Sequence, residues 1–415
     1  MVNNKKIRVA VIGIGLRGIG LLRYVLNMPD VEVLAVCDRV SKKLDIAKEA
    51  FAEKNCDTSN TLFTEDYKEA LKIIEIDAVI ISTPWSSHIE ISIAAMEAGK
   101  DVAVETGGAY NIESCWKLVD TAERTGRQCM MLENCNYGRR ELAVLNMARM
   151  GKFGKIVHAT GGYAHDLRAG LANHCKNNWY RHHEYINRNC DNYPQHALGP
   201  IAKILNINRG NRMVSLTSVA SCSHGMEHYV ATHCEDEHPL KGQKFNQGDI
   251  ITTTIKCAHG ETIVLTLDTT LPRTYSRHFG VHGTEGFSAE DGRFMYFENE
   301  HNHDMDPAEL YGNETEYFEK YDHPIWKVDK EKSIDRVVSA GGHGSMDKLV
   351  LRAFLESIRD GMPVPIDVYD TAAWMCITTL SEESIAKGSI PVSIPDFTQG
   401  KWVIRKFIKH SKWSI

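Results

Sequence analysis

Three glycines near the start of the chain have the spacing of a turn that binds phosphate groups. Gly13, Gly15 and Gly18 form the pattern G-x-G-x-x-G, directly after the apolar residues 7–12 and before a stretch with helical periodicity. In such a turn the first glycine allows a tight bend, the second lets the backbone approach a diphosphate, and the third lets helix and strand pack closely. The following helix offers free N–H groups to the phosphates. We therefore expect a dinucleotide to bind here.

An acidic residue after the next apolar segment indicates which dinucleotide the turn would bind. Asp38 follows residues 31–37, about 20 residues after the glycines, where a carboxylate usually binds the adenosine ribose. Its charge disfavours a 2′-phosphate, so we expect NAD rather than NADP, although Arg39 could pair with such a phosphate. The alternative is a glycine-rich turn in an unrelated doubly wound fold, and the surrounding strand, helix and Asp38 weigh against it.

Polar side chains also follow three later apolar segments, at 77–82, 101–105 and 128–132. Because ligands bind outside the carboxyl ends of strands in such sheets, we expect these side chains to hold the nicotinamide. Other roles are open for single residues of these segments. Ser87 could cap a helix instead of binding the cofactor, and Trp85 and His88 could serve only in packing. These polar segments contain Trp85, Ser86, Ser87, His88, Glu105, Thr106 and Asn134.

A second group of polar and aromatic residues lies in the middle of the chain. Tyr163 and His196, with Tyr193 assisting, are candidates for proton transfer, because phenols and imidazoles exchange protons once a neighbour tunes their pKa. Paired histidines could also be metal ligands, but neither H-E-x-x-H nor a Cys/His spacing occurs, so we expect no metal. Hydrogen bonds that fix a loop are the alternative role, and Tyr275 is as compatible with packing as with stacking on a sugar.

The first third of the chain alternates apolar and helical patterns, which indicates a parallel sheet covered on both faces. We expect this Rossmann domain to comprise residues 1–137. The expected strands are 7–12, 31–37, 77–82, 101–105 and 128–132, and the expected helices are 18–28, 40–53, 65–73, 87–98 and 112–126.

The pattern changes after about residue 154, where short apolar runs are separated by turns. We expect a second α/β domain, residues 138–415, with a large, open and mainly antiparallel sheet. Its expected strands are 156–163, 213–221, 248–257, 262–267 and 276–283, with an irregular stretch at 165–200 and helices near 345–359 and 369–386. Because the open sheet offers a free face, we expect a homo-oligomer, a dimer or a tetramer.

Composition narrows the class of protein. The 415 residues carry a net charge of −6, which gives no basic footprint for a nucleic acid. No apolar run is long enough to cross a bilayer. The 11 cysteines are scattered, without any C-x-x-C, so we expect free thiols and a cytoplasmic protein without a signal peptide. The alternative is export of a chain whose leader has been removed.

The first domain resembles the glucose–fructose oxidoreductase and inositol dehydrogenase family. Members of that family usually have Glu-Lys-Pro at the end of the strand that corresponds to residues 101–105 here, and the lysine serves hydride transfer. This chain has Glu105-Thr106-Gly107 instead. The departure argues against an ordinary sugar-alcohol dehydrogenase.

The second part of the chain contains several specific motifs: Gly161-Gly162-Tyr163, His165-Asp166-Leu167-Arg168, Asn192-Tyr193-Pro194-Gln195-His196, Asn206-Ile207-Asn208-Arg209-Gly210, Gly342-His343-Gly344 and Met346-Asp347. With these motifs the chain is similar to the NAD-dependent α-N-acetylgalactosaminidases, glycoside hydrolase family 109, and the resemblance extends from the first strand to about residue 385. The family commonly has Thr where this chain has Gln195, a departure that bears on sugar preference. The NAD-binding residues that this resemblance implies are Leu16, Arg17, Asp38, Trp85, Ser87, His88, Glu105 and Asn134.

This resemblance implies a hydrolase that uses NAD without net redox change. The sugar is oxidised at C3, the C1 substituent leaves by C1–C2 elimination, water adds, and the sugar is reduced again. NAD would stay tightly bound because each turnover regenerates it. The implied sugar-binding residues are Tyr163, Arg181, Tyr193, Pro194, Gln195, His196 and Tyr275.

Two other functions stay open for a chain of this kind. One is an NAD-dependent sugar or polyol dehydrogenase that releases NADH, and the other is a non-catalytic sensor of sugar or NAD. The missing lysine argues against a dehydrogenase. The polar residues of the second domain argue against a non-catalytic sensor. The family is typically exported, which conflicts with the expected cytoplasmic location.

Overall fold

The computed structural model describes residues 6–173, 180–326, 344–407 and 412–415. The chain forms two compact units, one of residues 1–134, 343–372 and 407–414, the other of residues 135–342, 373–406 and 415. This division differs from the expected domains, 1–137 and 138–415, chiefly because helix α13 (Gly344–Arg359) belongs to the first unit. There Arg352 of α13 pairs with Asp30 at 2.6 Å.

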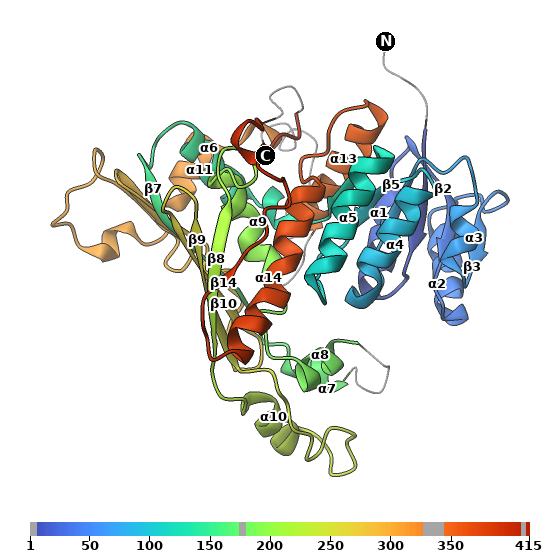
Figure 1. Ribbon diagram of the computed structural model, residues 1–415, viewed down its shortest axis with the longest axis horizontal. Coiled ribbons are helices and arrows are strands. Elements are labelled where there is room, and N and C mark those ends of the chain that lie inside the picture. The colour runs from blue at the N-terminus through green and yellow to red at the C-terminus, as the bar shows by residue number, and fades with distance from the viewer. Residues whose placement is uncertain (1–5, 174–179, 327–343, 408–411) are drawn as a thin grey trace. The chain divides into compact units, whose positions relative to one another are not determined.

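The first unit contains a six-stranded parallel sheet in the order β3-β2-β1-β4-β5-β6 (Figure 1). The strand order reverses between β1 and β4, and sheets of this kind bind ligands beyond the carboxyl ends of the strands at that point. The predicted parallel, doubly wound fold is confirmed. The strands are β1 (Ile7–Ile12), β2 (Val31–Cys37), β3 (Leu62–Thr64), β4 (Ala78–Ile81), β5 (Asp101–Val104) and β6 (Cys129–Met131).

Local sequence explains most of these elements. The strands β4 and β5 are buried along their whole length, as in a sheet covered on both faces. The short β3 was not predicted, because its three residues include an exposed Leu62 and form no apolar run. The helices of the unit are α1 (Leu16–Leu26), α2 (Ser41–Glu53), α3 (Tyr67–Leu71), α4 (Trp85–Glu97), α5 (Ile112–Thr125) and α13.

The second unit contains an eight-stranded sheet in the order β13-β12-β11-β7-β10-β9-β8-β14. Only β7 and β10 pair in parallel, and the other neighbours are antiparallel. The prediction of a large, mainly antiparallel sheet is confirmed. The strands are β7 (Ile156–Ala164), β8 (Met213–Ala220), β9 (Ile250–Cys257), β10 (Thr262–Asp268), β11 (Gly280–Gly283), β12 (Gly286–Ala289), β13 (Phe294–Phe297) and β14 (Val392–Ser393).

Part of the stretch expected to be irregular is helical. Residues 165–200 include two short helices and the start of α9, whose first residues carry the Tyr-Pro-Gln-His motif. The prediction failed because Pro194 and Pro200 break the helical pattern, yet Pro194 forms the N-cap of α9. The helices of this unit are α6 (Arg139–Arg149), α7 (Arg168–Asn173), α8 (Arg181–Asn187), α9 (Gln195–Ile204), α10 (Gly225–His233), α11 (Glu314–Tyr321) and the greater part of α14 (Val368–Ala386).

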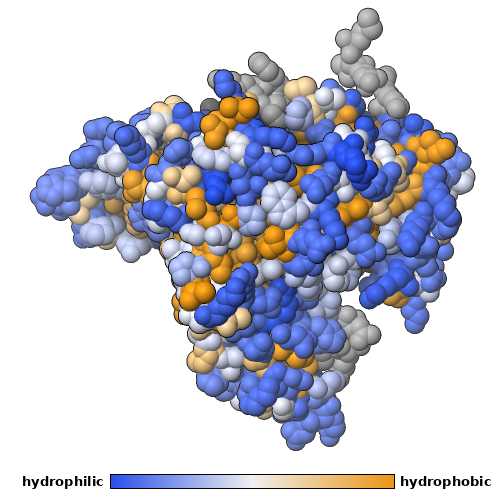
Figure 2. All heavy atoms as spheres, in the orientation of Figure 1, coloured by the Kyte–Doolittle hydropathy of each residue, from blue (hydrophilic) through white to orange (hydrophobic). Residues whose placement is uncertain are grey.

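Helix α9 packs on one face of this sheet, against β7 and β10. Along β9 the burial alternates, so that Ile251, Thr253 and Ile255 are buried while Thr252 and Thr254 are exposed. Among the described residues, no helix has the length and apolar character of a membrane span. Hydrophilic side chains are spread over the face shown in Figure 2, with hydrophobic ones between them.

Candidate functional site

The glycine turn of the first unit has room for a ligand at one of its three glycines. Gly13 has a φ of +94°, and a Cβ there would lie 2.7 Å from the backbone of Ser82. A Cβ at Gly18 would lie 1.9 Å from the carbonyl oxygen of Gly13, so close helix–strand packing requires glycine. A Cβ at Gly15 would meet nothing within 4 Å. The open space at Gly15 fits a diphosphate that approaches the backbone at the N-terminus of α1.

Asp38 lies directly beside this turn, at the end of β2. One carboxylate oxygen accepts the N–H of Ile14 at 2.7 Å, and the other accepts the N–H of Val40 at 2.9 Å. The carboxylate is therefore held at the position from which a dinucleotide-binding fold contacts the ribose. Leu16, which follows Gly15 in the glycine turn, is 74% exposed to solvent.

The segment after β4 is fixed by its own hydrogen bonds. The Ser87 hydroxyl donates to the hydroxyl of Thr83 and to the carbonyl of Pro84, at 2.8 and 2.9 Å. The His88 ring nitrogen Nε2 lies 2.7 Å from the carbonyl of Thr83, and burial lowers the pKa of His88 to about 4. Ser86 is exposed. These contacts hold the turn between β4 and α4. Ser87 does not cap the helix, because it lies within α4, whose N-cap is Pro84.

Trp85 joins this segment to the one that follows β5. Its buried ring lies so close to Gly107 that a Cβ there would be 2.4 Å from Cδ1 of the indole. Glu105 and Thr106, just before this glycine, are buried as well. The segments that follow β4 and β5 therefore contact each other through Trp85 and Gly107.

A charged network connects four residues at this edge of the sheet. Arg17 donates from Nε to Glu105 at 2.8 Å and from Nη2 to Asp347 at 2.7 Å, and its Nη1 also contacts Asp347. The Asn134 amide donates to the same Asp347 at 2.6 Å. We call Arg17, Glu105, Asn134 and Asp347 the Arg17 network. Three of its members were predicted to bind the cofactor, and Asp347 was not.

The second unit brings together five aromatic side chains that we call the aromatic cluster. Its members are Tyr163, His165, Tyr193, His196 and Tyr275. The ring of Tyr163 lies 4.7 Å from that of Tyr193 and 5.7 Å from that of His196, measured between centroids. Tyr193 and His196 are 4.9 Å apart. The structure thus unites all three predicted proton-transfer residues.

Close packing of β7 and α9 explains why these residues meet. A Cβ at Gly161 of β7 would lie 2.8 Å from Cβ of Ala197 in α9. Glycine at this position lets the helix approach the strand, which brings His196 at the first turn of α9 beside Tyr163. The neighbouring Gln195 is fully buried and donates to the carbonyl of Trp374 at 3.4 Å.

The hydrogen bonding and charge of the cluster suit proton exchange. The Tyr163 hydroxyl lies 3.2 Å from Nδ1 of His165. Burial and the nearby charge of Arg181 lower the pKa of His165, so the imidazole is neutral at neutral pH. The Arg181 guanidinium lies 4.8 Å above the ring of Tyr193. Burial raises the pKa of Tyr275, which keeps its phenol protonated.

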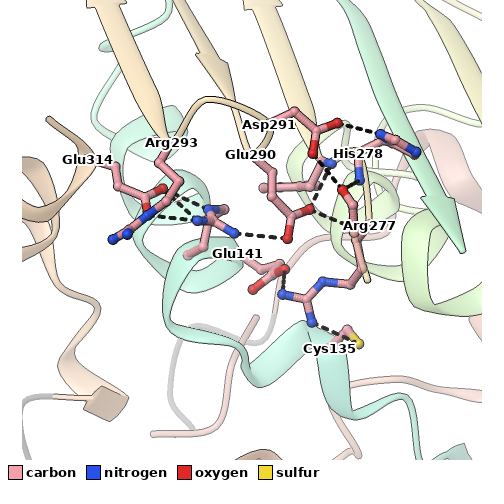
Figure 3. A network of polar contacts seen from close by, with 11 residues as sticks. Cys135, Glu141, Arg277, His278, Glu290, Asp291, Arg293 and Glu314 are labelled. Atoms are coloured by element: carbon pink, nitrogen blue, oxygen red, sulfur yellow. Dashed lines mark hydrogen bonds and ion pairs between the residues drawn. The ribbon is translucent and has the colours of Figure 1, made fainter. Parts of the chain in front are cut away.

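A polar network holds the segment that follows Tyr275 (Figure 3). The Glu290 carboxylate accepts the backbone N–H groups of Arg277 and Phe279, both at 3.1 Å. Asp291 accepts the Ser276 hydroxyl at 2.7 Å and contacts Nδ1 of His278 at 2.5 Å. Glu290 and Asp291, the two residues that follow β12, therefore hold the four consecutive residues 276–279 beside β7.

Arg277 connects the segment that follows Tyr275 to α6. Its guanidinium lies 2.6 Å from the carboxylate of Glu141 and donates to the Cys135 sulfur at 3.4 Å. Burial alone would lower the pKa of Arg277, but Glu141, Cys135, Tyr275 and Glu290 together outweigh it and hold the pKa above its ordinary value, so Arg277 stays charged. Figure 3 shows the network continuing toward Arg293 through Glu314, which also binds Arg140.

Sequence reasoning missed three residues of these sites: His165, Arg277 and Asp347. The spacing of Tyr163 and His165 was a usable signal, because residues i and i+2 of a strand share a face. Arg277 offered none, since its partner Glu141 lies 136 positions away (277 minus 141). Asp347 belongs to the Met346-Asp347 motif, but its partner Arg17 lies 330 positions away (347 minus 17), and the motif gave it no role. His343 lies outside the described residues.

Comparisons with known proteins place the chain in a family. Residues 7–133 match the oxidoreductase family with an NAD-binding Rossmann fold, and residues 137–404 match the C-terminal domain of glycosyl hydrolase 109. An alpha-N-acetylgalactosaminidase of Tannerella forsythia is 38% identical, over 96% of this chain and 88% of that protein. A glycosyl hydrolase family 109 protein of Shewanella sp. (strain W3-18-1) is 40% identical, over 95% of this chain and 86% of that protein.

Solved structures share the fold at lower identity. Levoglucosan dehydrogenase in complex with NADH and levoglucosan is 20% identical, with a TM-score of 0.69 over 94% of this chain and 100% of that chain. The myo-inositol 2-dehydrogenase of Lactobacillus plantarum is 16% identical, with a TM-score of 0.64 over 94% and 100% of the two chains. The resemblances seen in the sequence are confirmed: the chain belongs to glycosyl hydrolase family 109, and its first unit is an NAD-binding Rossmann domain.

Proposed function

We propose that the protein removes terminal N-acetylgalactosamine from glycans with the help of NAD and without net redox change. The observation that carries this proposal is the aromatic cluster, in which the buried phenol of Tyr193 and the buried imidazole of His196 lie beside Tyr163. The relative named alpha-N-acetylgalactosaminidase supports the choice of sugar. Thr106 supports hydrolysis over net oxidation, because the lysine of the resembling dehydrogenases is missing.

Residues of the first unit would hold the cofactor. The backbone at Gly15 and the N-terminus of α1 would bind the diphosphate, and Asp38 the adenosine ribose. Glu105 and Asn134 lie at the ends of β5 and β6, where the nicotinamide would bind. When bound, NAD would supply the reversible oxidation of the sugar at C3. It would stay bound, because it is unchanged over a turnover.

The aromatic cluster would supply the proton transfers. A ketone at C3 acidifies the proton at C2, since the resulting carbanion is delocalised as an enolate. Tyr163 would remove this proton with His165 as its acceptor, because that imidazole is neutral and lies 3.2 Å from the phenol. His196 would protonate the leaving oxygen at C1, with Tyr193 assisting. Water then adds to C1 and gives a proton back to His196, and Tyr163 returns the proton to C2.

The test uses the purified protein without added cofactor and nitrophenyl α-N-acetylgalactosaminide. Steady nitrophenol release without accumulation of NADH is the expected result. A substrate deuterated at C2 should react more slowly, because the C2–H bond breaks. Accumulation of NADH without nitrophenol would instead indicate a dehydrogenase. If neither nitrophenol nor NADH forms when NAD is supplied, the result would contradict the proposed activity on this sugar.

Two phenol variants test the assignment of Tyr163. Tyr163→Phe should lower kcat by about 10²–10⁴-fold, the usual contribution of one acid–base group. Tyr317→Phe is the matched control, because Tyr317 is a buried phenol of the same unit that binds Glu300 at 2.9 Å, outside the cluster. Equal losses in both variants would indicate that the loss is structural.

A further inference from the structure

Asp191 is a buried carboxyl group that the proposed chemistry does not use. It lies shortly before Tyr193 in the sequence and is 2% exposed. Its backbone N–H donates to the hydroxyl of Ser381 in α14 at 2.9 Å. The hydroxyl of Thr253 in β9 and the backbone N–H of Tyr193 act on its carboxylate as hydrogen-bond donors. Asp191 therefore connects the segment before α9 with β9 and with α14.

The polar contacts around Asp191 continue along the covered face of the sheet. Thr253 of β9 lies opposite Ser218 of β8, and their hydroxyl oxygens are 2.7 Å apart. The backbone N–H of Ser218 donates to the hydroxyl of Ser384 in α14 at 3.0 Å. These three side chains are fully buried. Because buried polar groups need hydrogen-bond partners, this series of contacts determines where the Asp191 carboxyl can lie.

The residues on either side of Asp191 are held by a single side chain, that of Gln247. Its amide nitrogen donates to the carbonyl of Cys190 at 2.9 Å, and its oxygen accepts the amide of Asn192 at 3.3 Å. The backbone that leads into Tyr193 is thus fixed both before and after Asp191. A change at this carboxyl would therefore reach Tyr193 and the first turn of α9 instead of being absorbed by a loose loop.

The charge of Asp191 is set by burial. Burial raises the pKa of this carboxyl to about 7, although Thr253 and the N–H of Tyr193 lower it. The other charged or titratable side chains of its own segment, of α8 and of α14 that act here are Glu184, Arg188, Cys190 and Glu382. Arg188 pairs with both glutamates, and burial raises the pKa of Cys190, whose thiol stays protonated. Asp191 therefore changes its charge near neutral pH.

We propose that Asp191 is a positioning residue, which holds Tyr193 and the first turn of α9 in place through the backbone N–H of Tyr193. An ionised carboxylate accepts an N–H more strongly than a neutral carboxyl group does, so the segment is held most firmly once Asp191 has lost its proton. The ring of Tyr193 lies 4.7 Å from that of Tyr163 and 4.9 Å from that of His196, so its displacement would disturb both pairs. The role in catalysis rests on the proposed function.

Two variants of Asp191 separate its shape from its charge. Asp191→Ala removes the acceptor, and kcat should fall about 10²-fold, the effect of a misplacement near 1 Å. Asp191→Asn keeps an oxygen that can accept the N–H but cannot ionise, so it should retain most of the activity. In the unaltered protein kcat/KM should rise with pH through about 7, and this rise should be missing in Asp191→Asn. His165 titrates at lower pH, because its pKa lies below its ordinary value.

Hydrogen exchange measures the position of the segment without any substrate. The amides of residues 192–196, followed by mass spectrometry at one pH, should exchange faster in Asp191→Ala than in the unaltered protein. The matched control is Asp101→Ala, because Asp101 is also a buried carboxyl with a raised pKa that accepts a backbone N–H, that of Gln128 at 2.8 Å. It begins β5, at the other end of the strand from Glu105. This variant should leave kcat and the exchange of residues 192–196 unchanged.

Three results would overturn the inference: an equal loss of kcat in Asp101→Ala and Asp191→Ala, the same pH dependence in Asp191→Asn as in the unaltered protein, or unchanged exchange of residues 192–196 in Asp191→Ala. If the unaltered protein releases no nitrophenol, the proposed function fails. The exchange comparison would still decide whether Asp191 positions the segment.

Discussion

At the scale of single residues, the proposed proton-transfer groups are phenols and imidazoles instead of paired carboxylates. Such groups act at neutral pH only if their surroundings hold them in the right protonation state. In the aromatic cluster, burial and Arg181 keep His165 neutral, and the phenol of Tyr163 lies within reach of it. Arg181 therefore acts on the chemistry through charge as well as through any contact with sugar.

Removal of the Arg181 charge should shift the pH dependence in a defined direction. In Arg181→Gln the pKa of His165 should rise toward its ordinary value, because one of its two main lowering influences is gone. The imidazole then protonates at a higher pH, so the loss of activity on acidification should begin at a higher pH. NMR titration of the His165 ring, beside the pH dependence of kcat/KM, measures this shift.

His323 provides an internal control in the same titration. Burial and Arg149, rather than Arg181, lower its pKa to about 4. Its titration should therefore be the same in Arg181→Gln and in the unaltered protein. A shift of both histidines would indicate a general change of structure, and a shift of neither would contradict the role given to Arg181.

At the scale of elements, glycines determine how closely helices and strands approach at both sites. Gly18 lets α1 pack on the turn after β1, and Gly161 lets α9 pack on β7. Gly15 differs, because its missing side chain leaves space that no described atom fills. Packing and ligand access are thus separate reasons for glycine, and they predict different consequences of substitution.

The two glycines of the turn should respond differently to alanine. Gly18→Ala should destabilise the first unit by about 1–3 kcal/mol, because its Cβ meets the carbonyl of Gly13. Gly15→Ala should fold normally, since its φ of −70° suits alanine, and should bind NAD at least about tenfold more weakly. Urea unfolding and cofactor titration of both variants make the comparison. Unaltered NAD binding in Gly15→Ala would contradict the placement of the diphosphate.

Close packing of β7 and α9 should matter more for catalysis than for stability. Gly161→Ala pushes Ala197 away and displaces His196 relative to Tyr163. We expect activity to fall about 10²-fold, the effect of a misplacement near 1 Å, with a loss of stability of about 1–3 kcal/mol. The double variant Gly161→Ala/Ala197→Gly removes the clash and should recover most of the activity. Absence of recovery in a folded double variant would contradict this explanation.

At the scale of the whole molecule, each compact unit carries its own part of the proposed chemistry. The first holds the cofactor-binding residues and the second the aromatic cluster. A reaction that restores its cofactor every turnover has no need to release it, unlike a dehydrogenase that delivers NADH. The proposed function therefore makes a claim about the purified protein before any substrate is added.

We expect the purified protein to carry stoichiometric NAD, released only on denaturation. Removal of the nucleotide should abolish hydrolysis, and addition of NAD⁺ should restore it. The loaded protein should also be more stable, by about 2.7 kcal/mol at a free concentration of 100 Kd. Chromatography of the released nucleotide and thermal unfolding with and without NAD measure these effects. Full activity in nucleotide-free protein, without added NAD, would contradict the proposed role of the cofactor.

The sequence by itself determined the parallel fold of the first unit and the glycine turn with Asp38. These features depend on local patterns, because strand–turn–helix chemistry and apolar periodicity lie within a few residues of one another. Most members of the Arg17 network and the aromatic cluster were named through the resemblance to a known family. The helices within residues 165–200 were missed, since Pro194 and Pro200 obscured the pattern.

Only the tertiary structure decided which distant residues meet. Asp347 joins Arg17, and Arg277 joins Glu141, by ion pairs between residues 330 and 136 positions apart, respectively (347 minus 17; 277 minus 141). No local pattern encodes such pairs, because a charged residue in a helix or loop is usually solvated and gives no sign of its partner. The Arg17 network and the contacts that hold the segment after Tyr275 therefore became visible only when packing had brought those charges together.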